Sequence, residues 1–213
     1  MTVTAKICGL STPATLDKAV AGGASHVGFV FFPKSPRHLD AERAAGLAAR
    51  VPAHVGRVGV FVDPGDELLD HVVAAARIDA IQLHGAEPPE RSAAIQRRYR
   101  VPVWKAVAVR ARADLDTAAR YRGAADRIVY DAKTPEGAAL PGGMGMRFDW
   151  RLLESFRHPL PWALSGGLDA DNIADAVRIS GAALVDISSG VESAPGVKDV
   201  DKIAAFLQSV AQL

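Results

Sequence analysis

Eight short apolar segments recur along the chain, and each is followed by a longer segment with the residue spacing of a helix. The apolar segments cover residues 3–8, 26–31, 54–61, 79–83, 102–107, 127–131, 161–165 and 183–188. Most are rich in Val, Ile or aromatic residues, and all are too short to be stable helices on their own. Because parallel strands need a crossover connection, this alternation predicts a parallel sheet with helices packed against it.

The segments between the predicted strands carry residues that start and stop helices. Pro13 lies near the start of one such segment and Gly22 near its end, where a helix C-cap is favoured. Asp40 is a candidate N-cap for the next helix, which should end before Pro52. Further segments with helical spacing cover residues 66–77, 87–99, 113–122, 148–156, 168–179 and 200–211.

The length of 213 residues suits one compact barrel with few insertions. We therefore predict a single α/β domain over residues 1–213, a (β/α)8 or TIM barrel. A doubly wound open sheet is the structural alternative. A dinucleotide site is disfavoured, because no Gly-x-Gly-x-x-Gly turn follows the first predicted strand. The longest candidate loop covers residues 132–147, and loops of that length are often functional lids.

The composition excludes several classes of partner and site. Lys and Arg number 25 against 24 Asp and Glu, without a basic run, so we expect no nucleic-acid partner. Cys8 is the one cysteine, which rules out a disulfide framework and thiolate-rich metal sites. The first residues lack the pattern of a signal peptide, and no apolar run is long enough to cross a bilayer. We therefore expect a cytoplasmic protein with no membrane partner.

Polar and ionisable residues gather at the C-terminal ends of the predicted strands, where TIM-barrel enzymes have their active sites. They include Cys8, Arg37, His84, Asp131 and Asp186. Each one alone has a plain structural explanation, such as a buried thiol, a helix cap or a solvated loop side chain. Their shared position at one rim of the barrel favours a functional site instead.

Two glycine-containing segments follow the seventh and eighth predicted strands, the usual phosphate position in such barrels. Residues 165–168 read Ser-Gly-Gly-Leu, and residues 188–192 read Ser-Ser-Gly-Val-Glu. Glycine lets backbone N–H groups approach an anion without obstruction by a Cβ atom. A single Gly-Gly pair would indicate no more than a turn, but two such segments predict a phosphate site formed by Gly166, Gly167, Ser189 and Gly190.

Several motifs, in order along the chain, resemble those of the phosphoribosylanthranilate isomerases. The most specific combination is the Lys-Ile-Cys-Gly start at residues 6–9 with Ser-Ser-Gly-Val-Glu at residues 188–192. The remaining motifs are residues 28–31, 35–37, 58–61, 82–85, 142–143, 148–150, 165–168 and 195–199. The resemblance thus runs from the first predicted strand to the last predicted helix.

The resemblance implies a TIM barrel that performs an Amadori rearrangement in tryptophan biosynthesis. N-(5-phosphoribosyl)anthranilate would become 1-(2-carboxyphenylamino)-1-deoxyribulose 5-phosphate, with Cys8 as general base and Asp131 as general acid. Arg37 matches the arginine that contacts the anthranilate part, Asp186 matches a substrate-contacting aspartate, and His84 is expected among the substrate-binding residues. The reaction needs no metal and no organic cofactor. We expect a small phosphorylated substrate as the partner and a monomer or a homodimer as the assembly.

The loop after the sixth predicted strand departs from the family pattern. Members usually carry a small hydroxyl residue where this chain has Met144, and often Lys where it has Met146. The loop also looks extended by residues 138–140. We expect these changes to affect the packing of the lid and the affinity for substrate, but not Cys8 or Asp131.

Two alternative functions stay open at this point. A bifunctional barrel isomerase of histidine and tryptophan biosynthesis would carry an aspartate where this chain has Cys8. A non-catalytic sugar-phosphate-binding barrel would keep the glycine segments but would have no need for both Cys8 and Asp131. Indole-glycerol-phosphate synthase would need an extra N-terminal segment and catalytic lysines that the sequence does not show.

Overall fold

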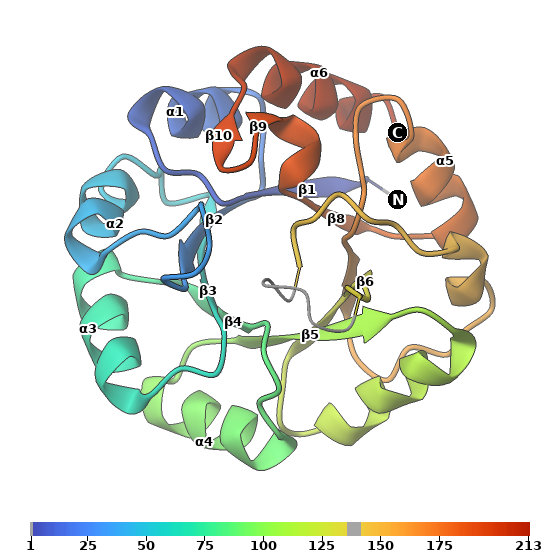
Figure 1. Ribbon diagram of the computed structural model, residues 1–213, viewed down its shortest axis with the longest axis horizontal. Helices are drawn as coiled ribbons and strands as arrows, with labels where there is room; N and C mark the ends of the chain where they lie inside the picture. Colours follow the sequence, from blue (N-terminus) through green and yellow to red (C-terminus); the bar gives the residue numbers. More distant parts are fainter. Residues whose placement is uncertain (1, 136–141) are drawn as a thin grey trace.

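A closed barrel of eight parallel strands forms the centre of the computed structural model, which describes residues 2–135 and 142–213 (Figure 1). Each strand pairs with its neighbour in sequence, and β1 pairs with β8 to close the ring. This confirms the predicted TIM barrel and rules out the open sheet. The strands are β1 (Thr4–Cys8), β2 (His26–Phe31), β3 (Gly56–Phe61), β4 (Ala80–Leu83), β5 (Val103–Val109), β6 (Arg127–Ala132), β7 (Trp162–Leu164) and β8 (Leu184–Ile187).

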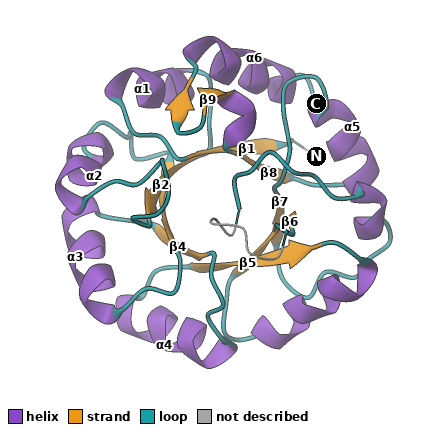
Figure 2. Cartoon of the chain, viewed as in Figure 1, coloured by secondary structure: helices purple, strands orange, loops and turns teal. Residues whose placement is uncertain are grey.

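A ring of helices surrounds the barrel on its outer side (Figure 2). Pro13 opens α1 and Gly22 caps its end, while the Asp40 side chain accepts a hydrogen bond from the Arg43 amide at the start of α2, as predicted. None of the described helices is long and apolar enough to cross a membrane. The α-helices are α1 (Pro13–Ala21), α2 (Ala41–Ala48), α3 (Asp66–Ala76), α4 (Pro89–Tyr99), α5 (Ile173–Ser180) and α6 (Val200–Ala211).

Two connections form 3-10 helices where the sequence suggested ordinary helical segments. In η1 (Arg112–Tyr121), the buried residues Leu115, Ala118 and Tyr121 recur at every third position. That spacing places them on one face of a helix with three residues per turn, which explains the tighter winding. The segment predicted at 148–156 keeps only η2 (Trp150–Leu153), and Ser155 just beyond it has a positive φ of 56°.

The chain between β8 and α6 forms a small addition at the rim of the barrel. It consists of η3 (Ser189–Val191), followed by a hairpin of β9 (Glu192–Ala194) and β10 (Val197–Lys198). Figure 1 shows this hairpin beside β1, between α1 and α6. The extension predicted at residues 138–140 lies outside the described residues.

Alternating side chains of each strand divide the apolar residues into two cores. One core lies between the strands and the helices. The other fills the inside of the barrel, with Val58 and Val60 of β3, Ala80 of β4 and Leu184 of β8 among its members. Side chains two positions apart lie on the same face of a strand. Residues two or four positions beyond these inward-facing side chains therefore also point inward, at the C-terminal end of the barrel. This alternation is what positions the site.

Two partly buried histidines pack against tryptophans. The His26 ring lies edge-on to Trp104, with ring centroids 5.1 Å apart, and burial together with the positive charges of Lys6 and Arg127 lowers the pKa of His26 to about 4. The His158 ring stacks on Trp162 at 4.2 Å, and burial again lowers its pKa to about 4. Both rings are therefore neutral in the folded protein at neutral pH.

We predict that the protein loses stability as the pH falls from 7 to 5. An unfolded histidine takes up a proton near pH 6.5, whereas these two rings resist protonation in the folded state, so acid favours unfolding. Because both rings are partly exposed, we expect on the order of 1 kcal/mol from each. Urea unfolding of the His26→Gln and His158→Gln double variant should show a shallower pH dependence.

His71 on α3 offers a matched control, because its side chain is exposed. His71→Gln should leave the slope of stability against pH unchanged. If the double variant keeps the slope of stability against pH seen in the parent protein, the acid sensitivity does not come from the two partly buried histidines.

Candidate active site

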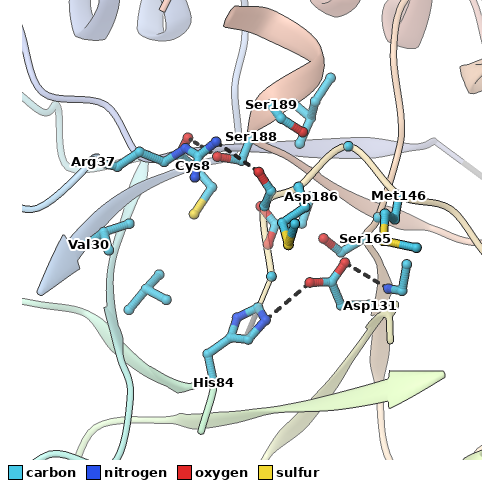
Figure 3. A pocket seen from close by; sticks show the side chains of 18 of the residues that line it. Cys8, Val30, Arg37, His84, Asp131, Met146, Ser165, Asp186, Ser188 and Ser189 are labelled. Carbon is cyan, nitrogen blue, oxygen red and sulfur yellow. Dashed lines mark hydrogen bonds and ion pairs between the residues drawn. The ribbon is translucent and has the colours of Figure 1, made fainter. Parts of the chain in front are cut away.

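One pocket at the C-terminal ends of the strands brings together every site residue predicted from the sequence (Figure 3). Its lining includes residues from β1, β4, β6, β8 and the loops after β2, β6 and β7. Met144 and Met146 also line it, although both stay substantially exposed. The predicted residues in its wall are Cys8, Arg37, His84, Asp131, Gly166, Gly167, Asp186, Ser189 and Gly190.

A buried ion pair lies under the pocket at the closure of the barrel. Lys6 and Asp186 stand opposite each other in the β1–β8 pairing, and Lys6 Nζ lies 2.9 Å from both carboxylate oxygens of Asp186. Lys6 is 0% exposed and Asp186 4%. Burial is the largest influence and acts to lower the pKa of Lys6, but the charge of Asp186, the hydrogen bonds to it and the neighbouring Cys8 together raise this pKa, so the ammonium stays charged.

Cys8 lies two residues after Lys6 on the same inward face of β1. Burial raises the pKa of its thiol, while the positive charges of Lys6 and Lys198 oppose that rise. Gly28 on β2 makes room for the sulfur, because a Cβ at Gly28 would lie only 2.9 Å from Cys8 Sγ. Burial therefore favours the protonated thiol at neutral pH, although charged side chains lie close to it.

Asp131 at the end of β6 is held by two hydrogen bonds. Its Oδ1 accepts from the Ala132 amide at 2.9 Å, and its Oδ2 lies 3.1 Å from His84 Nε2. The other ring nitrogen of His84 lies 3.3 Å from Gln82 Nε2. Gly142 closes over this pair, since a Cβ there would lie 2.6 Å from Asp131 Oδ2. The loop after β6 thus contacts the carboxyl group directly.

Arg37, in the loop after β2, is anchored by Glu192 at the start of β9. Its Nε and Nη2 donate to the two Glu192 oxygens at 2.7 and 2.8 Å, and Nη2 also donates to the Gly143 carbonyl at 3.0 Å. Arg37 is only 5% exposed. The guanidinium is therefore a fixed, buried cation in the pocket wall and not a solvated loop side chain.

The two predicted phosphate segments contact each other at one side of the pocket. Gly166 and Gly167 have φ angles of 90° and 64°, a region that residues with side chains rarely adopt. A Cβ at Gly190 would overlap the carbonyl oxygen of Leu168. Both segments thus need glycine, and Ser189, which begins η3, lines the pocket with them.

Sequence reasoning missed the roles of four buried polar residues around the site. Strand alternation could have predicted the inward position of Lys6, since Lys6 shares the inward face of β1 with Cys8. Gln82 and His84 share the inward face of β4 in the same way. Glu192 and Lys198 lie within the motifs quoted above, but a motif does not show that their side chains pair with each other.

The profile for "N-(5'phosphoribosyl)anthranilate (PRA) isomerase" matches residues 5–209. The chain belongs to this family. The N-(5'-phosphoribosyl)anthranilate isomerase of Zymomonas mobilis subsp. pomaceae is 59% identical over 100% of both chains, and that of Paramagnetospirillum magneticum is 53% identical over 98% of this chain and 97% of the relative.

Solved structures of the family superimpose over nearly the whole chain. The phosphoribosylanthranilate isomerase of Thermotoga maritima is 39% identical, with a TM-score of 0.89, and covers 99% of this chain and 100% of its own. A second isomerase structure, in complex with reduced 1-(o-carboxyphenylamino)-1-deoxyribulose 5-phosphate, is 36% identical, with a TM-score of 0.86 and the same coverage.

We predict that Lys6→Met destabilises the fold strongly. Removing the ammonium leaves the Asp186 carboxylate buried without its partner, which typically costs about 3–5 kcal/mol. The double variant Lys6→Met with Asp186→Leu should recover much of this loss, because no uncompensated charge remains. Chemical denaturation measures the free energy of unfolding of the single and the double variant. The exposed pair Arg50–Asp17 is the control, and Arg50→Met should change the stability little, because water screens both charges.

Proposed function

We propose that the chain catalyses the Amadori rearrangement of N-(5-phosphoribosyl)anthranilate to 1-(2-carboxyphenylamino)-1-deoxyribulose 5-phosphate, a step of tryptophan biosynthesis. The family match over residues 5–209 supports the reaction, as does the likeness to an isomerase solved with a reduced form of the product. The observation that carries the proposal is one pocket that presents both a thiol, on Cys8, and a carboxyl group, on Asp131.

Asp131 acts as the general acid in the first step. Its carboxyl group donates a proton to the furanose ring oxygen, the bond from that oxygen to C1′ breaks, and the nitrogen lone pair forms a C=N bond to C1′. The product is a protonated Schiff base with an open sugar chain. His84, which contacts Asp131 Oδ2, orients the carboxyl group for this transfer and also faces the bound sugar.

Cys8 acts as the general base in the second step. The Schiff base acidifies the C2′–H bond, the Cys8 thiolate takes this proton, and the electron pair moves to give an enolamine. Tautomerisation to the ketone then oxidises C2′ and reduces C1′ within the same molecule, so no external electron acceptor, metal or organic cofactor is required. Because burial raises the pKa of the thiol, activity should increase as the pH rises above neutral.

The remaining rim residues bind the two ends of the substrate. Arg37, fixed by Glu192, offers a positive charge to the anthranilate carboxylate, and Asp186 accepts a hydrogen bond from a sugar hydroxyl. The amides of Gly166, Gly167 and Gly190, together with the Ser189 hydroxyl, form the phosphate site. Met144 and Met146 add apolar surface over the aromatic ring.

The proposal also covers the assembly of the protein and its location in the cell. We propose a monomer or a homodimer that works in the cytoplasm as one catalytic domain. A solved structure of monomers generated from the dimeric phosphoribosylanthranilate isomerase of Thermotoga maritima is 38% identical, with a TM-score of 0.85.

We predict that Cys8→Ala and Asp131→Asn each lower kcat by at least about 10²-fold, because proton-transfer groups typically contribute about 10²–10⁴-fold. Binding of a reduced product analogue should be nearly unchanged. Cys8→Ser should be similarly slow, since a hydroxyl ionises far less readily than a thiol. Loss of anthranilate-type fluorescence from substrate generated in situ measures turnover, and isothermal calorimetry measures binding.

A purely structural Cys8 predicts a different result. Cys8→Ala would then unfold at a lower temperature but keep its kcat, and alkylation of the thiol would be slow and indifferent to the product analogue. An active, destabilised Cys8→Ala enzyme would overturn the proposed base. Inert Cys8→Ala and Asp131→Asn variants that still bind the analogue distinguish the enzyme from a sugar-phosphate-binding barrel.

Ser189→Ala tests the phosphate site with little disturbance to the backbone. Loss of one hydrogen bond to a charged group should raise KM about tenfold and change kcat little. Gly167→Val is a poorer test, because a side chain there would also collide with Arg147 and Met146. Ser193→Ala in the exposed hairpin is the matched control. An unchanged KM in Ser189→Ala would place the phosphate elsewhere.

A further inference from the structure

Glu192 is shared by two buried cations behind the pocket. Its Oε1 accepts from Lys198 Nζ at 2.6 Å as well as from Arg37 Nε at 2.7 Å. The side chains of Lys198 and Glu192 are 1% and 4% exposed. One carboxylate thus faces two positive charges, and this cluster of Arg37, Glu192 and Lys198 carries a net charge of +1 out of contact with water.

The cluster is connected to the backbone of Cys8 through one serine. Lys198 Nζ donates to the Ser188 carbonyl at 2.9 Å and to Ser188 Oγ at 3.1 Å. Ser188 Oγ in turn donates to the Cys8 carbonyl at 3.2 Å. Lys198 therefore lies close to the strand end that carries the thiol.

A buried net charge is unfavourable unless an opposite charge accompanies it. Within the described part of the chain, Lys198 has no carboxylate partner besides Glu192, which Arg37 already binds twice. The neighbouring Lys6–Asp186 pair is neutral as a whole and cannot supply the missing anion. The groups that can do so are the Cys8 thiolate and the anionic substrate.

We propose that Lys198 is a positioning residue whose surplus positive charge, held in place by Glu192, favours the thiolate form of Cys8 during the reaction. The proposal rests on the proposed role of Cys8 as the general base. It assigns to Lys198 of β10 a function beyond the anchoring of Arg37 by Glu192 in the same hairpin. Lys198 acts through Cys8 and is not itself a proton donor or acceptor in the rearrangement.

Charged groups from every neighbouring element also act on the thiol. Burial and the charge of Asp186 on β8 raise the pKa of the Cys8 thiol, whereas the charge of Lys6 on β1 lowers it. The other ionisable groups around the pocket are Arg37 after β2, His84 at the end of β4 and Asp131 on β6. Burial lowers the pKa of Lys198 itself, while Glu192 opposes this fall and helps to keep the ammonium charged.

The test is the pH dependence of Cys8 alkylation by iodoacetamide, an uncharged reagent that reacts with the thiolate. Lys198→Met removes the charge, and Lys198→Gln removes it while keeping a donor for Glu192 and Ser188. Both variants should move the midpoint of the alkylation rate to higher pH by on the order of one unit. The kcat at neutral pH should fall accordingly, with a smaller change in KM, and Lys198→Arg should recover most of the loss.

A purely structural role predicts the opposite shift. If the substitution only loosened the hairpin, water would reach the thiol, relieve its burial and move the midpoint to lower pH. Lys202→Met is the matched control, because Lys202 Nζ donates to the Glu192 carbonyl at 2.7 Å from the same region without joining the charge cluster. Its alkylation midpoint should equal that of the parent protein.

The outcomes separate this proposal from the one on which it rests. An unchanged or lowered midpoint in both Lys198→Gln and Lys198→Met overturns the role of Lys198. A raised midpoint with unaltered kcat supports the effect of Lys198 on the thiol, but overturns Cys8 as the base. The unfolding temperature of each variant is measured as well. A value above the assay temperature ensures that only folded proteins are compared.

Discussion

The ion pair between Lys6 and Asp186 is the interaction on which the site depends. It spans the seam where the first strand meets the last, and it fixes both side chains at full burial directly below Cys8. A cation and an anion in that position make the floor of the pocket polar but neutral. The barrel thus closes beside Cys8, the proposed general base, so damage to the pair should affect stability and activity together.

A second buried cluster builds on that neutral floor. Glu192 orients Arg37 toward the pocket and holds Lys198 behind Cys8, so one carboxylate from the β9–β10 hairpin serves two cations. The surplus positive charge suits a substrate that carries a carboxylate and a phosphate. It also suits a base that must become negatively charged before it can act. In the proposed mechanism the hairpin thus contributes electrostatics to a reaction whose proton-transfer groups, Cys8 and Asp131, are on the barrel strands.

Much of the fold follows from local patterns that the structure keeps. The eight apolar segments form the eight strands, and Pro13, Gly22 and Asp40 begin or end helices as expected. The connection at residues 112–121 differs because its buried side chains repeat every three residues, which favours a 3-10 helix. The segment at 148–156 shortens after Leu153, where the chain takes a left-handed turn at Ser155. Both differences depend on packing against the barrel, which a short window of sequence does not contain.

The sequence by itself determined the alternation of strands and helices, the position of polar residues at the strand ends and the motifs of the family. Strand alternation also places Lys6 with Cys8, and Gln82 with His84, on inward faces. Only the tertiary structure decided which of these groups pair. His84 contacts Asp131, and Arg37 and Lys198 share Glu192, because closure of the barrel and folding of the hairpin bring together residues up to 155 positions apart. Burial then raises the pKa of the Cys8 thiol and lowers that of Lys198, and burial is a property of the assembled fold and not of any one segment.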